Sequence, residues 1–394
     1  MGATANRFDL RRVKETTWGT TPSNPALSYV RNTGESLSES ISTEKSQEIR
    51  ADRATADLIP VDASVGGGVN FEFSYGAYDD LIASALMSAW VDTDVDGSVT
   101  TTTDAADNLS CTSAFTNVVV GQMITLRGMT TAANNRNYRV TGKTDNDTIT
   151  VYPIPNTAET TANANIIGSY CKNGVTEQSY TLVKRFNDAD PVTTQIFTGM
   201  RVGGFSLDLA TASLITGSFN FIGSDAEWST NPAFSGETSV AAPTNPVMNA
   251  VTNLTDIDQS GTNLCAAGTL ANITFELDNQ HREQKGVCKL GAVGVVAGQL
   301  MVNVSGSQYF ENADEANKFK AGTPFSFSFN LQDNLGNQYN FYMPKNKYES
   351  FEVNADSLDT DVMADSSFTS IYDEDTDAMI IISRIRASGD AGTT

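Results

Sequence analysis

Histidine and basic residues are scarce in this chain of 394 residues. It has one histidine, His281, and 25 Lys and Arg against 47 Asp and Glu, which gives a formal charge of −22. Any His-based metal site or acid–base mechanism would depend on that single residue. A protein that grips nucleic acid by neutralising phosphates needs the opposite charge balance. The composition therefore disfavours both an enzyme and a tight nucleic-acid binder.

Cysteine is scarce as well, and long hydrophobic runs are absent. No CxxC pair occurs, which excludes zinc ribbons and thioredoxin-like motifs; the four cysteines are Cys111, Cys171, Cys265 and Cys288. Two disulfides would match this count. A chain of this length can bury a large enough core without disulfides, so we expect four buried free thiols. No run is long enough to span a bilayer, and no apolar core of a secretory signal is present near the N-terminus. We expect a soluble protein made in a cytoplasm.

Apolar and polar residues alternate in several segments, which is the pattern of half-buried β-strands. Clear examples are Val69–Tyr75, Phe205–Leu209 and Phe325–Leu331. Two segments predict helices, Ala77–Trp90 and, more weakly, Glu311–Lys320. The predicted fold class is mainly β, a sandwich or barrel with one or two short helices.

Residues 94–167 look separate from the rest of the chain. They begin with a Thr- and Asp-rich stretch and continue with short strands predicted at Val118–Val120, Met123–Leu126, Tyr138–Thr141 and Thr148–Tyr152. This pattern predicts a small β-sandwich domain inserted into a larger, discontinuous β domain. The larger domain would comprise residues 1–93 and 168–394.

One segment matches half of a calcium-binding loop. Asp92, Asp94 and Asp96 are followed by Gly97, which gives the first oxygen ligands and the turn glycine of such a loop. The twelfth position is Thr103 instead of the bidentate Glu. We therefore favour an acidic linker and predict no metal site.

Other candidate chemical groups also have plainer interpretations. His281 has no GxSxG nucleophile motif to serve, so we expect it in an exposed turn. The triple glycine Gly66–Gly68 precedes a strand and has no following Lys, which favours a bulge or tight strand entry over a phosphate loop. Asp188 and Asp190 could be posed as glycosidase acids, but 47 acidic residues make such chance pairs common. We predict no catalytic residues and no cofactor.

A series of short motifs follows in a fixed order. The N-terminal third contains Glu15–Pro22 (ETTWGTTP), Val30–Leu37 (VRNTGESL), Ser46–Arg53 (SQEIRADR) and Val65–Phe73 (VGGGVNFEF), and then Tyr78–Ile82. Later come Thr198–Val202 (TGMRV), Asp333–Tyr339 (DNLGNQY), Met343–Pro344, Asp359–Val362 and Ile380–Arg384. In this order the chain resembles the tail tube (major tail) proteins of long-tailed bacteriophages. Residues 94–167 fall outside the match and are similar to the small surface domain often inserted in such proteins.

The resemblance implies a structural protein of the phage virion that is assembled in the host cytoplasm. Such protomers form hexameric rings that stack into a hollow tube around a tape-measure protein. Tail terminator and baseplate proteins would bind the tube ends, and genomic DNA would pass through the lumen at ejection. The resemblance carries over no catalytic residue, cofactor or membrane contact, and it places the inserted domain on the outer surface.

The polar segment Gly34–Asp57 is too long for a simple turn and too charged for a core. We expect a loop or hairpin that reaches the neighbouring ring through four charged residues: Lys45, Glu48, Arg50 and Arg53. Their basic members would meet an acidic partner surface.

The acidic excess would have a role in such a tube. Six protomers at −22 each would give a ring a charge of −132. A negative wall repels phosphates within about 8 Å at physiological salt, so DNA would pass without tight binding. Ten acidic residues and no Lys or Arg lie in Tyr348–Ser383, which we interpret as solvated surface not assigned to the lumen.

Three other virion components would have a similar composition and fold: a tail terminator, a baseplate hub and a capsid decoration protein. A surface β-sandwich adhesin or carbohydrate-binding module is a weaker alternative. It would need an aromatic platform, whereas Trp18, Trp90 and Trp228 are widely scattered.

Overall fold

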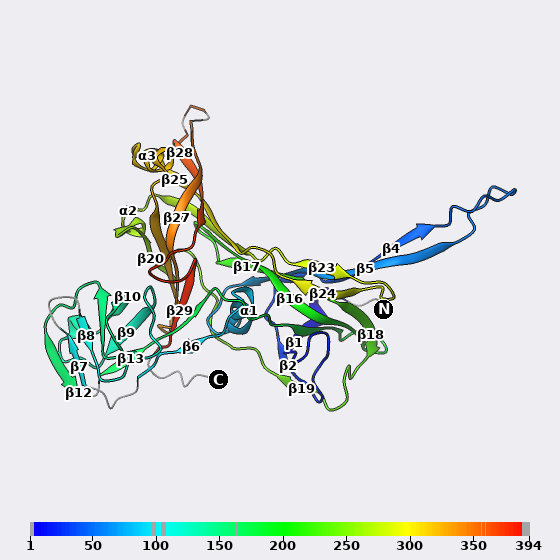
Figure 1. The fold of residues 1–394 in the computed structure, drawn as a ribbon, viewed down its shortest axis with the longest axis horizontal. Helices are drawn as coiled ribbons and strands as arrows, with labels where there is room; N and C mark the ends of the chain where they lie inside the picture. The colour runs from blue at the N-terminus through cyan, green and yellow to red at the C-terminus, as the bar shows by residue number, and fades with distance from the viewer. Residues whose placement is uncertain are drawn as a thin grey trace.

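The computed structural model describes residues 4–95, 100–103, 108–162, 164–355, 357–358 and 360–387. Strands dominate this part of the chain (Figure 1), so the prediction of a mainly β fold is confirmed. The α-helices within it are short: α1 (Asp79–Ala85), α2 (Leu264–Ala267) and α3 (Asp314–Ala321).

The larger sheet contains 20 strands and is organised around the long strand β16 (Thr193–Ala210). The first half of β16 pairs with β15 (Tyr180–Phe186) and β18 (Asp225–Thr230), and the second half pairs with β17 (Thr216–Ile222) and β22 (Leu270–Asp278). A second long strand, β27 (Gln338–Asn354), pairs with β26 (Phe325–Gln332), β28 (Met363–Ser370) and β29 (Ile381–Ile385). Strand β25 (Met301–Tyr309) connects the two groups by pairing with β22 and β28.

The remaining strands of this sheet extend its ends. They are β1 (Phe8–Lys14), β2 (Ala26–Tyr29), β3 (Gly34–Glu35), β4 (Ser38–Lys45), β5 (Leu58–Glu72), β6 (Val91–Asp92), β14 (Ser169–Lys172), β19 (Thr238–Val240), β20 (Leu254–Gln259) and β21 (Thr262–Asn263). Strands β5 and β17 pair, which continues the sheet towards β4. A separate two-stranded sheet is formed by β23 (Arg282–Lys285) and β24 (Ala292–Val296).

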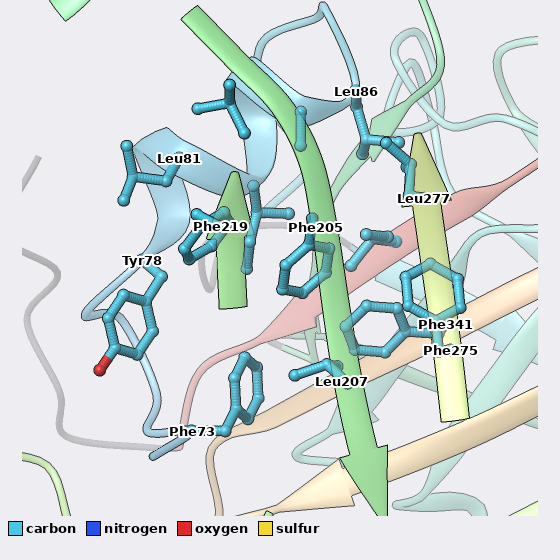
Figure 2. Close-up of a cluster of buried hydrophobic side chains, with 14 of the residues drawn as sticks. Phe73, Tyr78, Leu81, Leu86, Phe205, Leu207, Phe219, Phe275, Leu277 and Phe341 are labelled. Carbon is cyan, nitrogen blue, oxygen red and sulfur yellow. The ribbon is translucent and has the colours of Figure 1, made fainter. Parts of the chain in front are cut away.

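An aromatic core holds the larger unit together. Phe205 on β16 lies 4.9 Å from the ring of Phe219 and 5.8 Å from that of Phe275, measured between ring centroids. Figure 2 shows Leu81 of α1 on the side of Phe219 and Leu86, the residue after the helix, beside Leu277, so the helix covers one side of the cluster. Phe341 of β27 stacks on Phe329 of β26 at 4.6 Å and reaches Phe275 at 5.6 Å. Alternating side chains of packed strands thus build a sandwich-like core, as the period-two pattern requires.

Residues between β6 and β14 form a second sheet with its own core. Its strand order is β12-β7-β8-β11-β10-β9-β13. The bounds are β7 (Thr100–Thr103), β8 (Asn108–Ser110), β9 (Met123–Arg127), β10 (Asn137–Lys143), β11 (Thr148–Tyr152), β12 (Glu159–Ala162) and β13 (Asn165–Ile167). Tyr138, Ile149 and Phe115 belong to a buried cluster distinct from the main core. The strand predicted at Val118–Val120 is wrong, because Val118 enters this core from a turn that bonds its N–H to Phe115.

Helix α1 is shorter than the predicted Ala77–Trp90. Asp79 and Asp80 occupy its first turn as expected, where the helix dipole favours acidic side chains. The helix ends at Ala85, and Met87 then adopts a left-handed φ of 51°. Helix α3 begins three residues later than the predicted Glu311.

Candidate assembly interface

A long hairpin of β4 and β5 projects from the body (Figure 1). Its register runs from Ser38 opposite Gly66 to Lys45 opposite Leu58. Beyond these strands, the N–H of Ser46 donates to the carbonyl oxygen of Asp57 at 3.0 Å. The polar segment therefore forms a hairpin, which we call the arm (residues 38–66).

The arm exposes apolar side chains along its length. About half of each of four side chains is exposed: Ile41, Leu58, Ile59 and Val61. An isolated two-stranded hairpin is only marginally stable in water, and clustered exposed apolar residues mark interaction surfaces. The arm therefore has the composition of an interface and gains stability when a partner covers it.

Lys45, one of the four predicted contact residues, is the last residue of β4, and the other three lie in the segment beyond the paired strands β4 and β5. Lys45, Glu48, Arg50 and Arg53 are all exposed. Arg50 is not free, because its guanidinium pairs with Asp52 at 2.9 Å and lowers the pKa of that carboxyl. The sequence prediction overlooked Ile49, whose side chain is 99% exposed between these charges. The tip thus combines one apolar side chain with a charged rim.

The triple glycine lies at the base of the arm, in the middle of β5. A Cβ at Gly66 would lie 2.7 Å from the carbonyl oxygen of Phe221, and one at Gly67 would lie 2.4 Å from that of Ser36. Gly67 also has a φ of 141°. Neither the expected bulge nor the expected tight strand entry is found, because the three glycines lie inside β5, where β5 and β17 keep an unbroken register. These glycines instead let neighbouring backbones pass close to β5 where the arm leaves the sheet.

The hairpin of β23 and β24 contacts the base of the arm. Lys285 of β23 lies between two carboxylates, with N–O distances of 2.9 Å to Asp62 and 2.6 Å to Glu283. The N–H of Ala63 donates to the carbonyl oxygen of Leu290 at 3.0 Å. The arm therefore starts from a fixed base, although its outer half has few neighbours.

Two of the sequence motifs meet around the buried carboxylate of Glu15. We call this cluster the clasp; it consists of Glu15, Trp18, Gly19, Ser179, Thr181 and Gly199. Glu15 is 6% exposed, and its carboxylate accepts hydrogen bonds from the N–H groups of Gly19 and Gly199, each at 2.8 Å. Ser179 and Thr181 donate their hydroxyls to the same carboxylate at 2.6 and 2.9 Å. Nearby, the indole of Trp18 donates to the carbonyl oxygen of Gly199 at 3.0 Å. The ETTWGTTP and TGMRV motifs are therefore structural, since together they satisfy one buried carboxylate.

The remaining candidate groups do not form a reaction centre in the described residues. His281 is half-buried, not exposed as expected, because it packs against Gly203 on β16; this burial lowers its pKa. Asp188 accepts two hydrogen bonds from Thr4. No group of three or more potential metal ligands is found in this part of the chain. Asp96 and Gly97 of the calcium-like segment, and Asp356 and Asp359 of the acidic stretch, lie outside the described residues.

The cysteine prediction needs one correction. All four thiols are free, but only Cys111 and Cys171 are buried, while Cys265 is partly exposed and Cys288 is exposed. Cys288 lies in the short loop between β23 and β24, where no core is available to cover it. We also find, in the described chain, no helix with the length and hydrophobicity needed to cross a membrane.

The structure thus combines a strand-rich body with a projecting arm that exposes apolar side chains. A family model described as phage tail tube protein matches residues 6–370. The chain therefore belongs to the phage tail tube protein family, the structural proteins that self-assemble into the tail tube of the virion. None of the curated proteins matches it. The resemblance seen in the sequence motifs is confirmed at the level of this family.

Proposed function

We propose that this chain polymerises as stacked hexameric rings into the tail tube of a long-tailed, siphovirus-type phage. The tube would be the conduit for DNA during ejection. The observation that carries the proposal is the arm, which projects from the body (Figure 1) and carries four apolar side chains that the described residues leave about half exposed. Burying them against another protomer removes apolar surface from water, which is the main driving force of association.

The arm suits contact between rings. A contact that joins different surfaces of identical chains is heterologous and propagates until it closes or is capped. The arm of one ring would contact the next ring, with Lys45, Glu48, Arg50 and Arg53 facing acidic partner surface. Tail terminator and baseplate proteins would cap the two ends of the stack.

The charge of the chain suits a conduit. At −22 per protomer, a negative lumen would repel DNA phosphates at short range and allow transit without tight binding. The lumen would hold the tape-measure protein before ejection. Assembly would take place in the host cytoplasm.

We propose further that residues 94–167 form an inserted domain on the outer surface of the tube, within the discontinuous domain of residues 1–93 and 168–394. Its separate sheet and separate buried cluster support this division. In Figure 1 it lies on the opposite side of the body from the arm, so it would not block contact through the arm.

The test is negative-stain microscopy of the purified full-length chain and three variants. We expect tubes with a regular axial repeat from the unaltered protein. Deletion of Thr43–Ala54, or the single change Ile59→Asp, should leave a folded protomer by circular dichroism but abolish tubes. The matched control Val175→Asp places the same charge at an 87% exposed valine outside the arm and should leave tubes intact.

Two results would contradict the proposal. Single rings from the unaltered chain at every concentration would indicate a terminator or hub instead. Normal tubes from the deletion variant would show that assembly does not need the arm.

A further inference from the structure

Helix α3 is only partly covered by the rest of the protomer. None of its eight residues is buried. A cavity of about 650 Å³ opens beside it, and its lining includes Leu264 next to the helix and Tyr309 and Phe310 at the end of β25. Both aromatic side chains are more than one-third exposed. A short helix with no buried residue and an open, partly aromatic cavity beside it form an incomplete surface.

We propose that this cavity receives the arm tip of a second copy of the chain in the adjacent ring. The inference rests on the proposed stacking of rings and specifies the surface that the arm contacts. The occupant is the segment from Lys45 to Arg53.

The charges of the two surfaces are complementary. Glu311 and Asp314 line the cavity, are exposed, and make no ion pair with the described residues of their own protomer. On the tip, Lys45 and Arg53 are likewise exposed and have no acidic partner in the described part of the chain. In a chain of net charge −22, these two unpaired cations are exposed, each four residues from the exposed Ile49 in the sequence. Complementary rim charges fix the register of an interface and speed encounter.

Glu315 differs from the other two acidic residues of the cavity. Its carboxylate accepts hydrogen bonds from Lys318 at 2.8 Å, Tyr348 at 2.6 Å and Gln259 at 2.9 Å. These contacts fasten α3 to β20 and β27 and so fix the cavity wall. The side chains left for an incoming group are Glu311 and Asp314.

An apolar anchor completes the match. Ile49 is 99% exposed at the tip, and Tyr309, Phe310 and Leu264 line the cavity. Interfaces commonly place a buried apolar residue at the centre and charged residues around it. Ile49 would fill the cavity while Lys45 and Arg53 reach Glu311 and Asp314 at its rim.

The positions of the two surfaces permit propagation. Figure 1 shows the arm projecting from one side of the body and α3 lying on the other side. A protomer with a projecting group on one side and its receptor on the other can join head to tail without limit. A self-complementary pair on one side would instead stop at a dimer.

A charge exchange tests the contact. The variant Glu311→Lys/Asp314→Lys should lose tubes, and so should Lys45→Glu/Arg53→Glu. Combining all four changes restores opposite charges and should restore tubes, at least tenfold above either parent in pelleted polymer. The matched control Glu374→Lys/Asp375→Lys changes two exposed acidic residues elsewhere by the same charge and should assemble normally.

Cross-linking provides a second measurement if a variant folds poorly. In a Cys265→Ser/Cys288→Ser background, Ile49→Cys with Phe310→Cys should give an oxidant-dependent ladder of multimers, and either introduced cysteine alone should not. Tubes from the unaltered chain together with normal tubes from the Glu311→Lys/Asp314→Lys variant, or no ladder in assembled tubes, would overturn the docking site and leave the tail-tube function standing. Absence of tubes from the unaltered chain would overturn both.

Discussion

Arg12 and Asp80 form a bidentate ion pair that joins the first strand to helix α1. Nε of Arg12 lies 2.7 Å from Oδ2 of Asp80, and Nη2 lies 2.6 Å from Oδ1. The Arg12 side chain is only 9% exposed, whereas that of Asp80 is 42% exposed. Nη2 also donates to the carbonyl oxygen of Ala77 at 3.1 Å. The pair fixes the helix that covers the aromatic core.

We predict an asymmetric response to loss of this pair. Asp80→Ala should lower the free energy of unfolding by about 3 kcal/mol, because it leaves the buried guanidinium without a counter-charge. Arg12→Met should cost less, since it removes the buried charge and keeps most of the volume, while Asp80 remains accessible to water. Urea unfolding followed by tryptophan fluorescence, at concentrations where the chain is monomeric, measures both. Equal losses would show that burial of the charge does not control stability here.

The glycine in the clasp gives a second prediction. Gly199 has a φ of 68°, and a Cβ there would lie 2.9 Å from the Cβ of Ser224 and 3.1 Å from the indole of Trp18. Gly199→Ala should therefore add steric overlap to backbone strain and cost about 3 kcal/mol in total. The control is Gly261→Ala, at a φ of 86° with no atom within 4 Å of the new Cβ. That change should cost only about 1–2 kcal/mol by the same unfolding measurement.

Alkaline pH should destabilise the fold through a buried tyrosine. Burial raises the pKa of Tyr78 to about 12, against about 10 in an unfolded chain. The folded state therefore resists ionisation, so this contribution is complete below pH 10 and is lost as the pH rises from 10 through 12. Two pKa units correspond to about 2.7 kcal/mol.

Urea unfolding at pH 9, 10, 11 and 12 measures this loss. Tyr78→Phe should be less stable at pH 9, because it removes hydrogen bonds to the carbonyl oxygens of Arg31 and Glu72. It should also lose less stability on going to pH 12. In this variant the free energy of unfolding should still fall with pH, because burial raises the pKa of Tyr180, Tyr339 and Tyr348 as well. If the free energy of unfolding falls equally with pH in both proteins, Tyr78 ionises normally in the folded chain.

The contact between the two sheets gives a fourth prediction. Arg139 of β10 donates to the hydroxyl of Ser328 at 2.8 Å and stacks on Tyr342 at 3.8 Å from the ring centroid. Arg139→Ala removes both contacts and should loosen residues 94–167 from the larger domain without unfolding either core. Limited proteolysis should then cut at least fivefold faster near residues 94–95 and 167–168, and a denaturing gel should show three protected fragments. Arg127→Ala, a matched change of a partly exposed arginine on β9, should leave the cleavage rate unchanged.

Local pattern predicted the strands whose two faces differ in polarity. Val69–Tyr75 and Phe325–Leu331 alternate because one face meets the aromatic core, and most of their residues are strand in the structure. Strand β1 was missed because Arg11 and Arg12, which point to its two opposite faces, are both buried. Their charges are satisfied by Asp9 and Asp80, and Asp80 lies 68 residues further along the chain. A rule that assigns arginine to the surface cannot find such a strand.

The assembly surfaces were predicted unevenly for a similar reason. The charged tip was found because a run too polar for a core and too long for a turn has to lie outside. Ile49 was overlooked because a single isoleucine among charges carries no periodic signal. The cavity beside α3 escaped prediction because Leu264 and Phe310 come together only in the folded chain.

By itself, the sequence determined the mainly β class, the phage tail tube family and the position of the exposed charged hairpin. Each of these follows from local alternation, composition or the order of motifs. Tertiary structure alone decided that the Glu15 carboxylate accepts a hydrogen bond from Gly199, that Gly66 and Gly67 admit neighbouring backbones at the arm base, and that no residue of α3 is buried. The physical reason is that such contacts join residues far apart in the sequence. Their energy depends on which surfaces meet, and that is settled only after the chain has closed the loops between them.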